Sequence, residues 1–381
     1  MTFSLQDLTS PTVRSSRPLV LFLPDLSGGG GERITLTLGQ ELAERGLEVD
    51  LVVGRASGPL LHEVPPRLNL VDLDRPHLRA ALPDLARYLR VRRPQWIMPT
   101  VDHANVLGSL AARLSRSDTK VVLRPSTTLS VRAECASSTV DRLQFALSRH
   151  CYRSADAIVA CSRGMADDLT AYCSLPEGRV AVIPNASVVP DLQDRASSVP
   201  DHPWFATDQP PVVLGVGRLD HPKDFPLLVR AFAAARKQRH ARLILLGDGP
   251  QRDLLEDLAH DLGVADDVAL LGHVANPYPF MAHATVFALA STREGLPGVL
   301  IEAMACGAPV VATDCPSGPR EILADGAYGR LTPVGEVAPL ATALVETIDD
   351  PRPAPSSALD RFDAKTVADA YLELLNEVSH A

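Results

Sequence analysis

The sequence has few aromatic residues, no closely spaced cysteine pairs and no long apolar run. Phe, Trp and Tyr make up 4% of its 381 residues, which argues against aromatic carbohydrate-binding platforms and against a nucleic-acid binder that stacks on bases. Its 6 cysteines form no Cys-x-x-Cys pair and no Cys/His group with zinc-ligand spacing. Reduced thiols, no metal site and a cytoplasmic protein are therefore expected. No membrane span is predicted, and residues 1–17 lack the apolar core of a signal peptide.

Positive charge is concentrated in one part of an acidic chain. The formal net charge is −9, yet the chain between Arg75 and Arg153 holds 14 Lys/Arg and 5 Asp/Glu. This region predicts contact with an anionic partner, such as the inner face of a membrane. A solvated, arginine-rich helix face is an equally good interpretation.

Short apolar runs alternate with amphipathic helical patterns, which predicts parallel α/β sheets covered on both faces. A chain of 381 residues suggests two domains. The alternation stops in a proline-rich stretch, so we predict an N-terminal domain over 1–190, a linker over 191–211 and a C-terminal domain over 212–360. A final amphipathic helix within 361–381 is expected to pack back on the N-terminal domain.

The predicted strands are 19–24, 47–53, 95–99, 120–123, 157–161, 180–183, 211–217, 242–246, 268–271, 286–290 and 309–312. The predicted helices are 34–45, 82–91, 105–114, 140–152, 164–172, 225–238, 252–262, 299–306, 337–348 and 362–378.

The segment from Ser291 to Ile322 is the most informative, because two glutamates, Glu294 and Glu302, flank a Gly-Leu-Pro-Gly loop. The loop precedes the predicted helix 299–306, whose first amides and positive dipole end suit a phosphate. Glu294 would lie in the loop and Glu302 about one turn inside the helix. One carboxylate could hold sugar hydroxyls and the other a ribose. A glycosidase-like acid–base pair is the alternative for the two carboxylates taken alone.

Two further segments follow predicted strands and precede predicted helices. Gly217 is followed by Arg218 and Lys223, two cations at the carboxyl end of a strand that could hold a diphosphate. The loop Gly28-Gly29-Gly30-Gly31 allows backbone amides to approach a phosphate or sugar closely. No Gly-Lys-Ser/Thr follows it, which excludes a P-loop. The structural alternatives are surface charges beside a turn and a flexible strand–helix connection.

Some first-half residues carry weaker signals. His103 falls between a predicted strand and helix, where it could face an interdomain cleft, although a single histidine is more often structural. Arg124 ends the next strand, and Glu134 lies in an irregular segment, 125–139, that could border an acceptor pocket. Asp72-Leu73-Asp74 has the form of a metal-binding pair, but a strand end at the surface is the favoured interpretation.

Several motifs occur in order between Val212 and Pro333. They are Gly-Val-Gly-Arg-Leu at 215–219, Leu-Leu-Gly-Asp-Gly-Pro at 245–250, Gly-His-Val-Ala-Asn-Pro-Tyr at 272–278, Glu-x7-Glu at 294–302 and Asp-Cys-Pro-Ser-Gly-Pro-Arg-Glu-Ile-Leu at 314–323. With these motifs the second half resembles the family 4 glycosyltransferases of the GT-B fold. In the first half, the glycine loop and the segments 152–162 and 183–185 are similar to the same family.

The resemblance implies two Rossmann-like domains facing a central cleft and a retaining, metal-independent hexosyltransferase without a cofactor. It implies transfer of a sugar from a nucleotide sugar, with UDP expected, to a hydroxyl of a carbohydrate or lipid-linked acceptor. Arg218 and Lys223 would hold the diphosphate, and Glu294 the transferred sugar. The other implied donor contacts are Glu302 on the ribose, His273 and Val274 near the base, backbone of Gly217, Gly298, Val299 and Leu300 near the phosphates, the loop Gly29, Gly30 and Gly31, and His103 near the sugar. A nucleotide-sugar epimerase of the same fold and a non-catalytic sugar-nucleotide-binding protein are the alternatives.

Overall fold

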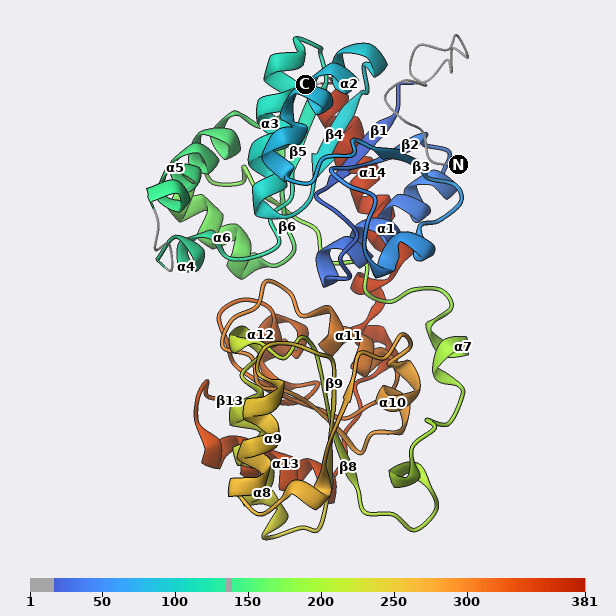
Figure 1. Cartoon of the computed structure of the whole chain (residues 1–381), viewed down its shortest axis with the longest axis vertical. Helices are drawn as coiled ribbons and strands as arrows, with labels where there is room; N and C mark the ends of the chain where they lie inside the picture. Colours follow the sequence, from blue (N-terminus) through green and yellow to red (C-terminus); the bar gives the residue numbers. More distant parts are fainter. Residues whose placement is uncertain (1–16, 135–138, 381) are drawn as a thin grey trace. The chain divides into compact units, whose positions relative to one another are not determined.

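The computed structural model describes residues 17–134 and 139–380, which divide into two compact units (Figure 1). The first unit contains the described residues up to Ala186 together with the C-terminal stretch from Ala364, and the second is Ser187–Asp363. Each unit has its own parallel sheet with helices on both faces, so the predicted α/β architecture is confirmed.

The first unit has a 7-stranded parallel sheet in the order β3-β2-β1-β4-β5-β6-β7. Its strands are β1 (Leu19–Leu23), β2 (Val49–Val53), β3 (Asn69–Asp72), β4 (Trp96–Pro99), β5 (Lys120–Leu123), β6 (Ala157–Ala160) and β7 (Ala181–Val182). Its helices are α1 (Gly30–Glu44), α2 (Leu82–Arg92), α3 (Asp102–Ser115), α4 (Leu129–Glu134), α5 (Thr139–Ser154), α6 (Arg163–Cys173) and α14 (Ala364–His380).

Both faces of this sheet are buried, because alternate residues of a strand point in opposite directions. Leu19 and Leu21 of β1 pack in a core with α1 and α14. Val20 and Phe22 of the same strand pack in a second core with α2 and α3. A strand buried on both sides needs an uninterrupted apolar run, which is the pattern that the sequence has at 19–23.

Helix α14 completes the first of these cores, as predicted for the C-terminal helix. Val367, Tyr371 and Leu375 recur at helical spacing and are buried against residues of α1 and the sheet. Arg45 of α1 pairs with Asp369 at 2.6 Å. Figure 1 shows α14 running beside α1.

The second unit has a 6-stranded parallel sheet in the order β10-β9-β8-β11-β12-β13. Its strands are β8 (Val212–Val216), β9 (Arg242–Leu246), β10 (Val268–Gly272), β11 (Val286–Leu289), β12 (Val310–Thr313) and β13 (Arg330–Thr332). Its helices are α7 (Leu192–Ala196), α8 (Phe225–Arg236), α9 (Arg252–Asp261), α10 (Tyr278–His283), α11 (Gly298–Ala305), α12 (Pro319–Ile322) and α13 (Val337–Asp349).

The segment predicted as a linker, 191–211, belongs to the second unit. Leu192 of α7 is 1% exposed, and the side chain of Gln193 donates to the carbonyl of Ala305 at 2.8 Å. Phe205 makes an edge-to-face contact with Phe280 of α10. The segment is irregular in sequence because it packs through isolated side chains, which leave no periodic pattern.

Other differences concern short elements and helix ends. Helix α1 begins at Gly30, so the predicted start at residue 34 is too late, and α4 forms within the segment 125–139 that was predicted as irregular. Strands β3 and β13 were not predicted as separate strands. With 4 and 3 residues they are too short to show a pattern of their own.

Candidate functional site

The strand order of each sheet brings the candidate residues together. In the first unit, β1 lies between β2 and β4. In the second unit, β8 lies in the same way between β9 and β11. Ligands of open parallel sheets bind at the carboxyl ends of strands where the order reverses in this way. The loops that leave β8 and β11 carry Lys223 and Glu294. The glycines lie between β1 and the first turn of α1, and His103 lies in the first turn of α3, which follows β4.

Lys223 and Glu294 form an ion pair at this edge of the second sheet. The ammonium of Lys223 lies 2.6 Å from Oε1 of Glu294, and the hydroxyl of Ser291 donates to the same oxygen at 2.6 Å. The two charged side chains are 21% and 12% exposed, and partial withdrawal from water strengthens their attraction. The amide of Thr292 donates to the carbonyl of Pro222 at 2.9 Å, which fastens one loop to the other.

Cys315 is a neighbour of this pair that the sequence analysis did not single out. Burial raises the pKa of its thiol to about 12, the charge of Glu294 adds to the rise, and Lys223 opposes it. The thiol is therefore protonated and neutral at physiological pH. The sequence gives no sign of this cysteine's role, because only folding brings Cys315 close to Lys223 and Glu294.

Arg218 pairs within its own loop. Its guanidinium lies 2.5 Å from Oδ2 of Asp220, and the Arg218 side chain is 76% exposed. The Asp220 side chain is only 15% exposed, so the arginine is the part of this pair that is accessible to a ligand.

The motif at 245–250 supports the loop that carries Lys223. Gly247 has a φ of +131°, and a Cβ at this position would overlap the carbonyl oxygen of Gly217. The aliphatic stem of Lys223 lies over Gly217, where a Cβ would be 3.5 Å from its Cδ and Cε. Glycine at 247 is therefore needed for the shape of the neighbouring loop, rather than for direct contact with a ligand.

Helix α11 begins at Gly298, with Pro297 at the N-cap. The amides of Gly298 and Val299 lie in its first turn, where an α-helix provides no internal acceptor. The amide of Leu300 donates to the carbonyl of Pro297 at 3.1 Å. The expected phosphate contact of the Leu300 amide is therefore not supported, whereas those of Gly298 and Val299 stay predictions.

The remaining donor candidates lie on the same unit. Glu302 is half-buried one turn into α11, where its charge adds to the burial that raises the pKa of Cys306 to about 12. Val274 and His273 follow β10, the first half-buried and the second exposed. Their contacts with a ribose and a base stay predictions.

In the first unit, the glycine loop meets the segment before His103. A Cβ at Gly31 would lie 3.5 Å from Cγ1 of Val101. Val101 has a φ of +72°, an unusual backbone conformation for a β-branched residue. His103 is exposed in the first turn of α3. Two segments that are far apart in sequence thus converge at the carboxyl ends of β1 and β4.

The amino end of α1 is covered by the protein's own carboxylate. Gly30 and Gly31 lie in its first turn, and a Cβ on Gly29 would overlap the carboxylate of Glu32. Burial raises the pKa of Glu32, hydrogen bonds from its own backbone and from Ser27 oppose the rise, and the charge of Asp25 adds to it. Two carboxylates disfavour a phosphate, so of the two expected ligands of this loop the sugar hydroxyls fit better.

Arg124, predicted on the acceptor side, is buried in the first unit, and its contact with an acceptor stays a prediction. It is 4% exposed, and its guanidinium donates to Oδ1 of Asn185 at 2.6 Å. Burial raises the pKa of Tyr371 in α14, and the charge of Arg124 opposes that rise. Arg124, which follows β5, therefore contacts Asn185, near the point where the chain leaves the first unit, and lies close to Tyr371 of α14. Glu134 ends α4, and its side chain lies outside the described residues.

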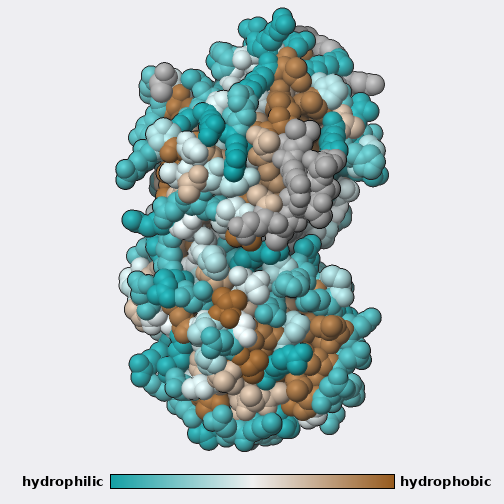
Figure 2. All heavy atoms as spheres, turned by 90° about the vertical axis from the view of Figure 1, so that its left-hand side faces the viewer, coloured by the Kyte–Doolittle hydropathy of each residue, from teal (hydrophilic) through white to brown (hydrophobic). Residues whose placement is uncertain are grey.

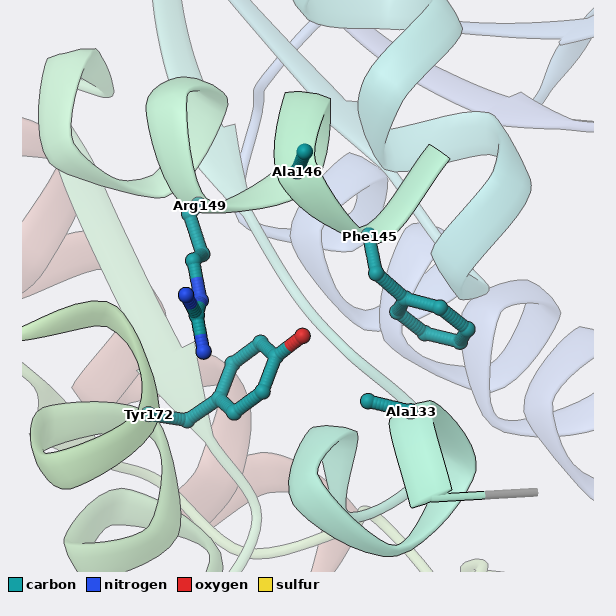
Figure 3. Close-up of a pocket in the computed structure, with 5 residues that line it drawn as sticks. All are labelled: Ala133, Phe145, Ala146, Arg149 and Tyr172. Atoms are coloured by element: carbon teal, nitrogen blue, oxygen red, sulfur yellow. The ribbon is translucent and has the colours of Figure 1, made fainter. Parts of the chain in front are cut away.

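A cavity of about 200 Å³ lies among α4, α5 and α6 (Figure 3). Phe145 and Arg149 from α5, Tyr172 from α6 and Ala133 from α4 line it. The guanidinium of Arg149 stacks 4.2 Å from the centroid of the Tyr172 ring. Ala133 belongs to the segment 125–139, which by its sequence could border an acceptor pocket.

No group of three or more His, Cys, Asp and Glu side chains in residues 17–134 and 139–380 is arranged to hold a metal ion. In the same residues no helix is both long and apolar enough to cross a membrane. The carboxylate of Asp72, the last residue of β3, accepts a hydrogen bond from the amide of Asp74 at 2.8 Å. The two aspartates therefore belong to a turn at the end of this strand.

Known families match both halves of the chain. Residues 28–186 match the model for Glycosyltransferase Family 4, and residues 210–350 match the model for Glycosyl transferases group 1. Over 344 residues the chain is 30% identical to the N-acetylgalactosamine-N,N'-diacetylbacillosaminyl-diphospho-undecaprenol 4-alpha-N-acetylgalactosaminyltransferase of Campylobacter jejuni, which covers 87% of this chain and 90% of the relative. The chain belongs to glycosyltransferase family 4.

Other relatives and solved structures agree with this membership. The 2-deoxystreptamine N-acetyl-D-glucosaminyltransferase of Streptomyces fradiae is 30% identical over 356 residues, with 84% of this chain and 83% of the relative covered. Anabaena HepE in complex with UDP-glucose superposes with a TM-score of 0.80 at 22% identity, over 95% of this chain and 100% of HepE. The likeness to HepE shows that this glycosyltransferase has the GT-B fold.

Replacing Gly247 tests the support that the 245–250 loop gives to Lys223. We expect Gly247→Ala to cost more than about 2 kcal/mol of stability and to weaken nucleoside-diphosphate binding at least about tenfold, because the new Cβ displaces the neighbouring loop. Gly263→Ala is the matched control: its φ is +67°, but nothing lies within 4 Å of the added Cβ. It should cost about 1 kcal/mol and leave binding unchanged, as measured by denaturation and titration calorimetry. Equal effects of the two variants on binding would contradict the proposed support.

Proposed function

We propose that this glycosyltransferase moves a sugar from a nucleoside-diphosphate sugar, with UDP as the expected diphosphate, to a hydroxyl of a glycan or lipid-linked acceptor. The observation that carries the proposal is the Lys223–Glu294 pair in the loops that leave β8 and β11, the second of which leads into α11. A cation and a helix end suit a diphosphate, and a carboxylate suits the hydroxyls of a neutral sugar. The undecaprenol-linked substrate named for the Campylobacter relative and the UDP-glucose bound by HepE support it.

In the proposed reaction, the bond between the anomeric carbon and the diphosphate oxygen breaks, and a bond from that carbon to the acceptor oxygen forms on the same face. The acceptor proton passes to the leaving phosphate, so no separate base is needed. Negative charge grows on the departing diphosphate. Lys223, Arg218 and the first amides of α11 stabilise this charge more in the transition state than in the ground state, which makes a metal ion unnecessary.

The Lys223–Glu294 pair solves a problem of charge in this scheme. A carboxylate that holds the sugar would otherwise repel the diphosphate attached to that sugar. Lys223 neutralises Glu294 at 2.6 Å, so the carboxylate can accept sugar hydroxyls beside a dianionic group.

A screen of UDP-, GDP- and ADP-sugars for release of the nucleoside diphosphate tests the proposed activity. With the donor that the parent enzyme uses, Lys223→Ala and Arg218→Ala should each lower turnover by roughly 10²-fold, the effect of losing one charge-stabilising donor. Lys237→Ala, which removes an exposed lysine at the end of α8, is the control and should keep parental turnover. Near-normal turnover of both site variants would refute the assigned roles, and epimerisation without an acceptor would identify an epimerase instead.

Glu294 is proposed to contact the sugar and not the diphosphate. Glu294→Ala should therefore lower turnover of the sugar donor by about 10²-fold while changing the affinity for the free nucleoside diphosphate much less. Turnover is measured with the donor from the screen, and affinity by calorimetric titration. Losses of the same size in both measurements would show that Glu294 does not recognise the sugar.

Contact with an anionic membrane is proposed for the positive region of the first unit. Many of its arginines pair internally, as Arg75 does with Asp84 at 2.6 Å, but Arg87 and Arg116 are exposed. Val91 and Leu114, each 53% exposed, lie in the last turns of α2 and α3. Figure 2 shows one side of the molecule, largely hydrophilic with apolar residues among the polar ones.

Vesicle sedimentation tests this contact. The parent should sediment with phosphatidylglycerol vesicles and not with phosphatidylcholine vesicles. The double variant Arg87→Glu/Arg116→Glu should weaken binding at least about tenfold, since each basic residue contributes about 1 kcal/mol near an anionic surface. Arg67→Glu, an exposed arginine outside the region, should have a much smaller effect. Failure with both lipids, or equal binding to both, would retire the membrane contact.

A further inference from the structure

Ser187 has a buried hydroxyl with no hydrogen-bond partner among the described residues. The residue is 3% exposed, and its Oγ is one of the few buried side-chain atoms in residues 17–134 and 139–380 that lack a partner. The Oγ is directed at the first residue of α11, since a Cβ on Gly298 would lie 3.3 Å from it. The unpartnered hydroxyl is therefore at the helix end where the sequence analysis expects a phosphate.

A buried hydroxyl without a partner destabilises the protein that carries it. Alanine would fill nearly the same space at position 187 without that cost, and the preceding residue is in fact the buried Ala186. A hydroxyl that faces a helix N-terminus can instead donate to an anion held there, together with the amides of Gly298 and Val299. The loss of stability is then recovered when the anion binds.

We propose that the hydroxyl of Ser187 donates a hydrogen bond to a phosphate of the nucleoside diphosphate at the amino end of α11. The inference rests on the proposed function and adds to it a phosphate-binding residue outside the motifs of the second unit. Ser187 is the first residue of the second unit and follows directly on Ala186 of the first unit. It therefore connects phosphate binding to the segment by which the two units are joined.

The backbone holds Ser187 firmly in this position. Its amide and that of Val188 both donate to the carbonyl of Phe362, at 3.2 and 3.1 Å, and Val188 forms a parallel bridge with Asp363. Both connections between the units thus lie side by side at this point.

Titration of the full chain with nucleoside diphosphates and their parent nucleosides tests the contact. For whichever of UDP, GDP and ADP binds the parent, Ser187→Ala should weaken affinity about tenfold, whereas affinity for the matching nucleoside should stay within about twofold. The thermal midpoint of ligand-free Ser187→Ala should equal or exceed that of the parent, because the unpaired hydroxyl is gone. Ser187→Thr, which keeps a hydroxyl, should bind the diphosphate more tightly than Ser187→Ala.

Ser197→Ala is the matched control, because it removes an exposed hydroxyl of the same segment that donates to the carbonyl of Asp194. It should leave all three measurements unchanged. Unaltered diphosphate affinity in Ser187→Ala, or an equal loss for the nucleoside, would overturn the phosphate contact and leave the proposed function standing. If the parent binds none of the three diphosphates, the donor assignment fails, and the contact fails with it.

Discussion

Parallel pairing of β1 with β4 and of β8 with β11 is the constraint on which the placement of the candidate residues within each unit depends. Parallel strands end at the same edge of a sheet, so the loops that follow neighbouring strands emerge together. This brings Lys223 within 2.6 Å of Glu294 across 71 residues of sequence and places Gly31 beside Val101. The chemistry is carried by loops, but the sheets decide which loops can meet.

The two halves differ in charge although they share this geometry. In the second unit a lysine neutralises a carboxylate, and the loop beside it carries an exposed arginine. In the first unit the corresponding helix end is covered by Glu32, with Asp25 nearby. One half therefore suits an anion joined to a sugar, and the other suits neutral hydroxyls.

The sequence predicts the strands of both sheets well, because buried strands leave local patterns, and it locates the segment that leads into α11. Continuous apolar runs mark the buried strands, and the Glu-x7-Glu segment marks the loop and first turn of α11. Facts that depend on tertiary packing are out of reach. Arg124 looks like a polar strand end but is buried against Asn185. The amide of Leu300 donates to the carbonyl of Pro297. The segment 191–211 belongs to the second unit although its sequence shows no periodicity. Nothing local distinguishes Ser187 or Cys315 from other small residues.

The chain order of the two units has a consequence for how the protein is made. The second unit, Ser187–Asp363, is an insertion within the first, whose core includes Val367, Tyr371 and Leu375 of α14. A ribosome delivers the chain from its amino end, and domains tend to fold as they emerge. The second unit is therefore complete in sequence while the first still lacks one wall of its core. The unit that begins first is completed second, and its unfilled apolar face is open to chaperones or to other chains until α14 has been synthesised.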